Sequence, residues 1–248
     1  MGRWPAIADY GFLSDCQSAA LVDRDGAIDW CCFGRFDQRP VFARLLDREK
    51  GGFFRVGPVA PCSTSRRYLP GTLILETRFE ARGGVLVLTD CLPVQHPGGS
   101  HGQPRGPSGH ELLVRHLRCE AGEVEVELVF APRFDYGLTT PLVQVLAPDL
   151  AVATGGADGL LLHADLGPLH TDCERAVARA SLRAGEERTV SRWSGPSRRS
   201  CRCDACPQRC FAGRWNRPTP SGTAGPTAAS TEGATRKRCS AARWCSRV

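Results

Sequence analysis

The chain has 248 residues, of which 42% are hydrophobic and 23% are charged, and its formal net charge is +6. These proportions are typical of globular proteins, and no run of about 18 apolar residues is present, so we expect no membrane span. The opening MGRWPAIADYGF has no apolar secretory core and carries Asp9 early. We therefore expect a cytoplasmic protein, in which thiols usually stay reduced.

Charge and apolar residues are divided unevenly along the chain. Residues 191–248 contain 12 Lys or Arg residues, two acidic residues and six of the 13 Cys, but no Leu, Ile, Met or Tyr. The first 190 residues contain 20 basic and 24 acidic residues. Because a segment without Leu or Ile can bury little apolar surface, we predict a folded domain over residues 1–190. Residues 191–248 are predicted to be a disordered, basic, low-complexity tail.

The first part of the predicted domain contains two hairpin signals. Residues 17–33 place Asp25-Gly26 between two apolar runs, and residues 72–91 repeat this arrangement around the turn sequence ARGG. Glycine tolerates the positive φ that a tight hairpin turn needs. Between these segments, residues 40–50 (PVFARLLDREK) look briefly helical, with proline at the first position.

The second part of the domain alternates more strongly. Residues 110–134 predict two strands around Ala121-Gly122, and residues 149–166 and 175–193 read as two further hairpins. In the strand after Gly122, apolar and acidic side chains occupy opposite faces: Val124, Val126, Leu128 and Phe130 against Glu123, Glu125 and Glu127. About eight to ten short strands at this spacing predict an all-β fold, an antiparallel β-sandwich.

The histidines do not follow a metal-ligand pattern. His96, His101 and His110 lie in or beside the Gly/Pro-rich residues 96–109, without strict ligand spacing. A solvated loop is the simpler interpretation of these residues. We expect no metal and no cofactor in this domain.

Carboxylates are plentiful, but no complete active site can be recognised. Asp29, Asp37, Asp90 and Asp135 each lie beside an aromatic residue or at a strand end. Glycosidases use a pair of carboxyl groups, yet sequence alone brings no two of these together. No serine-hydrolase, zinc-protease or nucleotide-binding motif is present. We therefore expect no catalytic residue here.

The tail offers two other kinds of site. One is half of a zinc site, formed by Cys201, Cys203, Cys206 and Cys210, but no second Cys or His pair follows at about 12 to 20 residues. The other is a nucleic-acid contact, in which clustered arginines would bind phosphates while Trp215 and Trp244 stack on bases. Nucleic-acid binding through the tail stays open as an alternative function, but our main expectation is that nucleic acid is not a partner.

Three ordered stretches of the domain resemble one family. Residues 7–47 (IADYGFLSDCQSAALVDRDGAIDWCCFGRFDQRPVFARLLD) are similar to the opening of bacterial family-fifteen glycoside hydrolases, the glucoamylase and trehalase-like group. YLPGTLILETRF…GVLVLTDCLPV and LLVRHLRCEAGEVEVELVFAPRFDYG resemble its next two blocks, including the ending P-R-F-D-Y-G. The resemblance covers residues 6 to about 190.

The resemblance implies a non-catalytic domain. In that family, the region is an N-terminal β-sandwich that packs against a helical (α/α)6 barrel. The barrel holds the two catalytic glutamates for inverting hydrolysis of α-glucosidic bonds. The partner implied for this domain is that barrel, and α-glucosides are substrates of the parent enzyme only. The chain leaves no room for the barrel, so we expect it to be inactive as written.

The resemblance also supplies site candidates. The residues that it places nearest the barrel interface or the substrate cleft are Asp29, Trp30, Arg35, Phe36 and Asp37. Ordinary core packing is the alternative for Trp30 and Phe36. In the same loop, Gly34 and Gln38 depart from the family's Pro and Ser.

A shifted reading frame gives the tail a different meaning. Suppose that the true reading frame is shifted by one nucleotide, so that each true codon consists of the last base of one residue's codon and the first two bases of the next. The bases that encode residues 235–247 are then compatible with the sequence Y-x-E-A-V-L-R-S-A-L-V-L-K. This string resembles the helix that opens the family's barrel, and it is amphipathic. Our hypothesis is a frameshift between about residues 190 and 234, so that the tail is out of frame. A free-standing carbohydrate-binding β-sandwich stays open as an alternative, although only 7% of residues are aromatic.

Overall fold

The computed structural model describes residues 4–93 and 111–194. The predictions for the Gly/Pro-rich residues 96–109 and for the tail beyond residue 194 therefore lie outside the described residues. These include the disorder of the tail, its cysteines, its nucleic-acid contact and its reading frame. Among the described residues, no helix is long and apolar enough to cross a bilayer.

The described residues form 14 β-strands and two short 3-10 helices, with no α-helix. The strands are β1 Gly11–Ser14, β2 Ala19–Val22, β3 Ala27–Cys32, β4 Phe53–Pro58, β5 Cys62–Tyr68, β6 Leu75–Ala81, β7 Gly84–Cys91, β8 Glu111–Ala131, β9 Leu142–Ala147, β10 Leu150–Gly155, β11 Asp158–Ala164, β12 His170–Thr171, β13 Ala176–Arg183 and β14 Glu187–Ser194. The 3-10 helices are η1 Ile7–Asp9 and η2 Asp135–Gly137. The last strand thus runs past the predicted domain boundary at residue 190.

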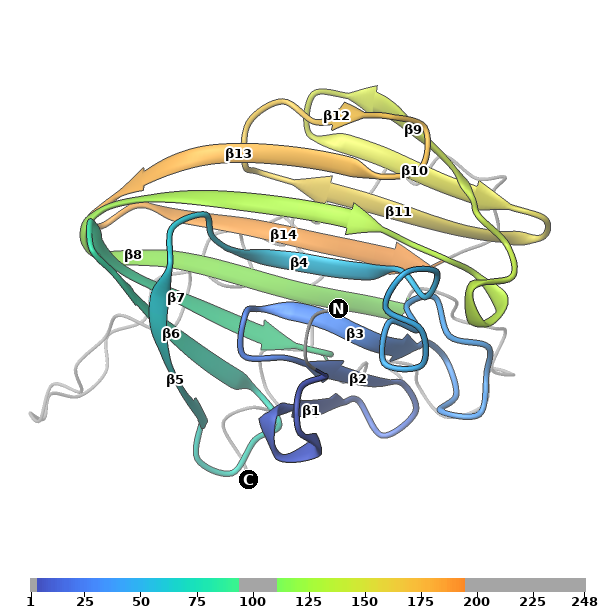
Figure 1. Ribbon diagram of the computed structural model, residues 1–248, viewed down its shortest axis with the longest axis horizontal. Helices are drawn as coiled ribbons and strands as arrows, with labels where there is room; N and C mark the ends of the chain where they lie inside the picture. The colour runs from blue at the N-terminus through green and yellow to red at the C-terminus, as the bar shows by residue number, and fades with distance from the viewer. Residues whose placement is uncertain (1–3, 94–110, 195–248) are drawn as a thin grey trace, which may run out of the picture.

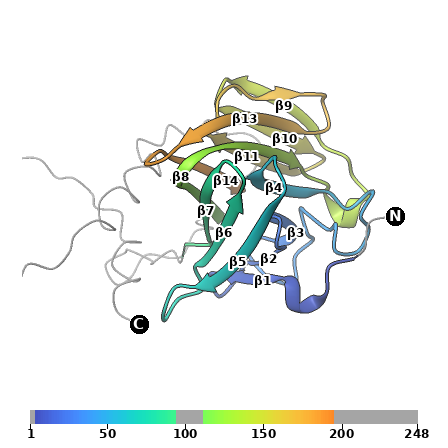
Figure 2. The ribbon, with the colours of Figure 1, turned by 60° about the vertical axis from the view of Figure 1, so that its left-hand side comes forward.

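The strands make two antiparallel sheets packed face to face, which confirms the predicted all-β, antiparallel β-sandwich (Figures 1 and 2). The first sheet has the order β1-β2-β3-β4-β8-β13-β12. The second sheet has the order β5-β6-β7-β8-β14-β11-β10-β9. Strand β8 therefore belongs to both sheets and joins them.

The 21 residues of β8 turn a corner between the sheets. Residues before Gly122 pair with β7 and β14, and residues after it pair with β4 and β13. Gly122 has a φ of +69°, and a Cβ atom there would lie 2.0 Å from the carbonyl oxygen of Gly83. Only glycine fits this close approach. The two strands predicted around Ala121-Gly122 are thus one bent strand.

The hairpin predicted over residues 175–193 is wrong. Strands β13 and β14 do not pair with each other; they pair with the two halves of β8 in different sheets. They turn the same corner as β8 through Gly185, whose φ is +88°. A glycine-containing turn between two apolar runs has the same local sequence in a hairpin and at a sheet corner, so sequence could not separate them.

The other local predictions have mixed outcomes. The hairpins predicted over residues 17–33, 72–91 and 149–166 are confirmed as β2–β3, β6–β7 and β10–β11. The helix predicted over residues 40–50 is wrong, because that segment consists of turns. Two of its backbone donors bond beyond the segment: Ala43 N–H donates to Gly51 O and Arg44 N–H donates to Gly52 O.

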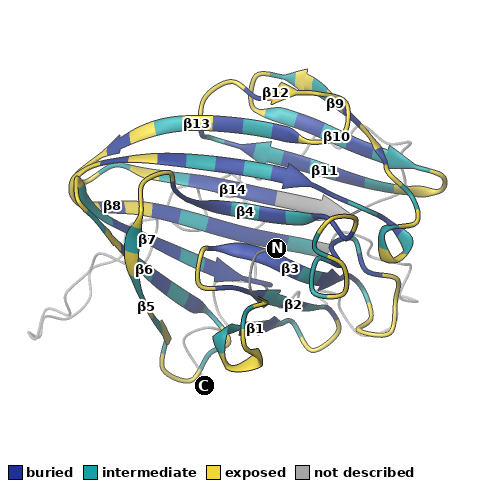
Figure 3. Ribbon diagram, viewed as in Figure 1, coloured by how far each residue is buried: buried dark blue, intermediate teal, exposed yellow. Residues whose placement is uncertain are grey.

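The core lies between the sheets, and buried residues alternate with more exposed ones along β8, β10, β11 and β13 (Figure 3). Its centre contains three aromatic rings, those of Phe42, Phe54 and Phe130, whose centroids are 5.4 to 6.0 Å apart. The offset and edge-on arrangements of these rings are the ones that aromatic pairs prefer.

A charged pair is buried beside these rings. Arg115 of β8 is 0% exposed and donates to both carboxylate oxygens of Asp90, at 2.8 and 3.1 Å. It also donates to Phe54 O at 2.8 Å and Gly26 O at 2.7 Å. Asp90 lies in the second sheet, whereas Phe54 lies in the first and Gly26 in the turn between its strands β2 and β3, so this guanidinium ties the sheets together.

Candidate functional site

A β-bulge in β3 puts two of the predicted site residues on the same outer face. Val22 pairs with Ile28 but Leu21 pairs with Trp30, so Asp29 is the extra residue of the bulge. Ile28 belongs to the core between the sheets. Asp29 and Trp30 therefore both point away from the core, onto the outer surface of the first sheet.

Asp29 is nevertheless fully buried, because other segments cover it. The hydroxyl of Tyr10 donates to its Oδ2 at 3.0 Å, and Nε of Arg44 donates to its Oδ1 at 2.6 Å. Nη2 of the same arginine donates to Oδ2 of Asp23 at 3.3 Å. The Arg44 guanidinium also lies over the ring of Phe53, 4.2 Å from its centroid. One arginine thus serves two buried carboxylates.

The electrostatics of this cluster favour a supporting role over acid–base chemistry. Burial, together with the adjacent Asp29 carboxylate, raises the pKa of Tyr10 well above its usual range. Burial also raises the pKa of Asp23, while a hydrogen bond from Ala27 N–H lowers it. The two carboxylates share an arginine, and that arrangement holds the segments around Tyr10 and Arg44 onto β3.

Large apolar side chains lie on β3 and on the segments that follow β3 and β8, and these segments are joined by the ring contact of Trp30 with Tyr136 and by the ion pair of Arg39 with Asp135. We call this the loop-end surface; its members are Trp30, Phe36, Leu46, Tyr136 and Leu138. Leu138 is 82% exposed and Phe36 is 75% exposed. The rings of Trp30 and Tyr136 are 6.2 Å apart, and η2 lies beside the loop that follows β3 (Figure 1).

The backbone that presents Tyr136 is strained. Asp135 and Tyr136 have φ values of +53° and +60°, which residues other than glycine rarely adopt, and Gly137 follows at +88°. An ion pair between Arg39 and Asp135 at 3.6 Å holds the turn, and a Cβ atom at position 137 would lie 2.8 Å from Lys50 O. Sequence reasoning missed Tyr136 as a site residue; its available signal was the P-R-F-D-Y-G ending.

The remaining predicted residues lie on the exposed loop after β3. Arg35 donates to the two oxygens of Asp37 at 2.8 and 2.7 Å, and this hydrogen-bonded partner lowers the pKa of Asp37. Phe36 lies between them in sequence, and its carbonyl accepts a hydrogen bond from the Cys32 thiol at 3.3 Å. The structure therefore places Arg35, Phe36 and Asp37 at the surface, whereas Trp30 is half-buried and Asp29 is fully buried.

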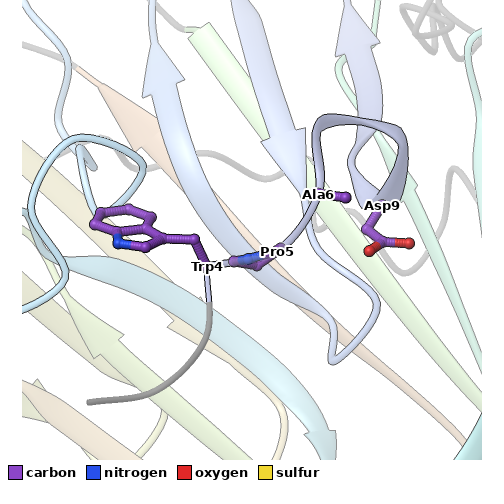
Figure 4. Close-up of a pocket in the computed structure, with 4 residues that line it drawn as sticks. All are labelled: Trp4, Pro5, Ala6 and Asp9. Carbon is purple, nitrogen blue, oxygen red and sulfur yellow. The ribbon is translucent and has the colours of Figure 1, made fainter.

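Two depressions of the described surface bear on this question. One, of about 380 Å³, is lined by Trp4, Pro5, Ala6 and Asp9, and Trp4 and Asp9 stand at opposite ends of this segment (Figure 4). The Asp9 carboxylate is already paired with Arg24 at 2.6 Å. This depression offers no free pair of carboxylates for hydrolysis.

The second depression, of about 280 Å³, lies over Phe53 and Ala131. Three acidic residues line it, Glu49, Asp172 and Glu174. Asp172 is paired with Arg175 at 2.8 Å and Glu174 with Arg133 at 2.7 Å. Within residues 4–93 and 111–194, no three His, Cys, Asp or Glu side chains come close enough together to hold a metal ion.

Comparison with known proteins gives a consistent result. The family model described as "Trehalase-like, N-terminal" matches residues 3–192. The trehalase of Mycolicibacterium smegmatis is 39% identical over 141 residues, which cover 54% of this chain and 21% of that protein. The trehalase of Mycobacterium tuberculosis is 37% identical, and the match covers the same shares of the two chains. The trehalase of Thermoplasma volcanium is 29% identical, and the match covers 57% of this chain and 22% of that protein.

This chain therefore spans about a fifth of the length of the curated relatives it matches. It corresponds to their N-terminal domain, and the match does not cover a catalytic domain. Among solved structures, a putative kojibiose phosphorylase from human microbiome aligns with 68% of this chain and 19% of its own at a TM-score of 0.32 and 7% identity. That likeness is too weak to support an inference.

Proposed function

Because the chain belongs to the family of trehalase-like N-terminal domains, we propose that its folded part is the non-catalytic β-sandwich of a glucoamylase- or trehalase-like glycoside hydrolase. In trehalases, this domain accompanies a catalytic domain. The parent enzyme would hydrolyse α-glucosidic bonds with inversion, using two carboxyl groups of a helical (α/α)6 barrel. The 248-residue chain would be inactive alone.

The loop-end surface is the observation that supports docking to such a barrel. Isolated exposed apolar residues are common, but a group of large ones around a strained turn marks an interaction site. Phe36 and Leu138 expose most of their side chains, and Tyr136 exposes 49% of its own. Burying these groups against a partner would stabilise the complex through the hydrophobic effect.

Each predicted site residue has a role in this proposal. Asp29 positions the surface from below through Arg44, whereas Trp30 supports the ring of Tyr136. Phe36 supplies apolar contact area, and the Arg35–Asp37 pair forms a polar rim beside it. Any contact of these residues with an α-glucoside would occur only in the intact parent enzyme.

The proposed setting is the cytoplasm. Among the described residues, Cys16, Cys32, Cys62, Cys119 and Cys173 are free cysteines, which suits a reducing compartment. A reading-frame change beyond the domain remains our explanation for the composition of residues 191–248. Sequencing the gene past residue 190 tests it: a single intact frame with no barrel sequence in any other frame would contradict it.

A binding experiment tests the docking proposal. The 248-residue chain is titrated into a version of Mycolicibacterium smegmatis trehalase that lacks its N-terminal domain. We expect saturable binding, and we expect the double variant Phe36→Asp/Leu138→Asp to weaken it by about tenfold or more. The control is Leu73→Asp, at a leucine between β5 and β6 that is 45% exposed. Trehalose hydrolysis by the chain alone at an enzymatic rate would contradict the proposal.

A carbohydrate-binding module is the second candidate. The adjacent rings of Trp30 and Tyr136, with Tyr136 half exposed, are the observation that favours it. Saturable quenching of tryptophan fluorescence by trehalose or maltose, lost in Tyr136→Ala, would support this function. Unchanged fluorescence at millimolar sugar would count against it.

A further inference from the structure

The depression of about 280 Å³ over Phe53 and Ala131 is built from three segments that are far apart in the chain. Its lining residues come from residues 48–53, 131–133 and 172–175, and we call it the three-segment pocket. Gly52 has a φ of +69°, and a Cβ atom there would lie 2.5 Å from the carbonyl oxygen of Ala131. Glycine thus allows the first segment to approach the second closely.

The charged side chains of this pocket balance one another, because three arginines and three acidic residues line it. Arg133 donates to Oε2 of Glu174 at 2.7 Å and to the backbone carbonyl of Glu174 at 3.2 Å. Asp172 is paired with Arg175 at 2.8 Å. These contacts hold part of the polar wall in place. A lining with equal numbers of positive and negative groups favours a neutral polar ligand over an ion.

Two lining residues, Arg48 and Glu49, keep hydrogen-bonding capacity for a ligand. Within residues 4–93 and 111–194, neither of them forms an ion pair, and the buried Nη1 of Arg48 has no hydrogen-bond partner. Arg48 as a whole is half-buried, and Glu49 is exposed. A guanidinium only donates hydrogen bonds and a carboxylate only accepts them, whereas a hydroxyl group does both. A ligand with several hydroxyl groups can therefore bind both side chains at once.

The pocket also has an apolar part, formed by Phe53 and Ala131. The Phe53 side chain is half-buried, and the guanidinium of Arg44 lies over its ring, 4.2 Å from the centroid. Arg44 is not a lining residue, so another part of the ring borders the pocket. An apolar surface beside a few polar groups is the usual composition of a small-molecule site, and such sites measure roughly 300–1,000 Å³. The volume here suits a single sugar ring, which packs its C–H groups on an aromatic surface.

We propose that the three-segment pocket binds one neutral, hydroxyl-rich ring, such as a hexose unit of a sugar. Arg48 donates hydrogen bonds to its hydroxyl groups, Glu49 accepts hydrogen bonds from them, and the C–H face of the ring packs on Phe53. The pocket shares no residue with the loop-end surface, so this site is separate from the rings of Trp30 and Tyr136. It also does not depend on docking to a catalytic domain.

The test is an NMR titration of the isotope-labelled 248-residue chain with glucose, trehalose and maltose in separate experiments. We expect saturable shifts of the backbone amide signals of the three segments, with dissociation constants in the millimolar range. The double variant Arg48→Ala/Glu49→Ala should raise the dissociation constant about tenfold or more. Arg82→Ala, at an exposed arginine between β6 and β7, is the control and should stay within about twofold of the wild type. If the double variant does not fold, Glu49→Ala alone, expected to weaken binding about threefold, replaces it.

Four outcomes would overturn the proposal, and none of them bears on docking to a catalytic domain. The first is the absence of a saturable shift at about 100 mM sugar. The second is binding that Tyr136→Ala abolishes and the double variant leaves intact, which would assign the sugar to the Trp30 and Tyr136 rings. The third is binding of maltose without binding of glucose, which would require more than one ring. The fourth is a response of the same signals to inorganic phosphate and not to the sugars, which would identify an anion site.

Discussion

Two arginine–aspartate pairs in this domain share nearly the same geometry and differ in their surroundings. Arg115 donates to both oxygens of Asp90 at 2.8 and 3.1 Å, and Arg35 donates to both oxygens of Asp37 at 2.8 and 2.7 Å. The first pair is 0% exposed on both sides, whereas the side chains of the second are 69% and 52% exposed.

Burial, not geometry, gives these pairs different roles. Water screens the exposed pair and can replace either partner, so the pair shapes its loop without holding the fold. In the core, no water replaces a lost partner, and Arg115 also satisfies two backbone carbonyls from the opposite sheet. The buried pair therefore stabilises the fold, whereas the exposed pair lies on the surface that we propose docks to the catalytic barrel.

Removal of the buried arginine is expected to have the largest effect. Arg115→Met leaves Asp90 charged and unpaired in the core, which costs about 3–5 kcal/mol of the free energy of unfolding. Urea unfolding measures this loss. The double variant Asp90→Leu/Arg115→Met removes both charges and should recover part of it. Equal losses in the single and double variants would show that the carbonyl contacts matter more than the ion pair.

A change in the buried cluster of Asp29, Arg44 and Asp23, on the outer face of the first sheet, should have an intermediate effect on stability. Asp29→Asn removes the charge that binds Arg44 and should lower the free energy of unfolding by about 1.5–3 kcal/mol. It should also lower the pKa of Tyr10, since the Asp29 carboxylate contributes to raising it. Urea unfolding and ultraviolet titration of the phenol report the two effects. Asp25→Asn, an exposed change in the same hairpin, is the control and should alter neither.

A pH dependence should come from the outer face of the second sheet. Burial lowers the pKa of His116 below its usual 6.5, although Glu187 at 3.5 Å opposes this. The unfolded chain then binds the proton more readily, so the stability that this group contributes is present above 6.5 and is lost as the pH falls. His116→Gln should reduce the decrease in unfolding free energy between pH 7.5 and 5.5, while His170→Gln, an exposed control, should not.

The exposed pair should give the smallest change in stability. Arg35→Ala should leave the urea midpoint unchanged, because solvent already screens the interaction with Asp37. Binding to the trehalase that lacks its N-terminal domain should weaken, since the loop that carries Phe36 loses its internal bond. If Arg35→Ala instead lowered stability greatly and left binding unchanged, the exposed pair would be the structural one, contrary to our interpretation.

Local sequence was sufficient for much of the fold. Asp25-Gly26 identified the β2–β3 turn, and alternation identified the inward face of β8 beyond Gly122. Both signals act within a few residues. The corner at Gly122 and Gly185 was missed, because a glycine turn becomes a sheet corner only through pairing among strands such as β4, β7 and β8, which come from separate parts of the chain.

The candidate site was predictable only in part. The resemblance selected Trp30 and the loop after it, but it could not show that Asp29 is covered by Tyr10 and Arg44. It also did not single out Tyr136, which is brought to Trp30 by a strained turn more than 100 residues later. Such contacts depend on the packing of distant segments, which no local pattern records.

The corner shared by β8 and β13–β14 sets a limit on where this gene can be interrupted. Among the described strands, β14 is the last to be synthesised, and it fills the position in the second sheet between β8 and β11. A stop codon or change of frame before residue 187 would leave both neighbours with open edges that recruit other chains. An interruption after residue 194 spares every pairing of the sandwich. A cell that lost the downstream part of this gene would still produce a domain able to close on itself.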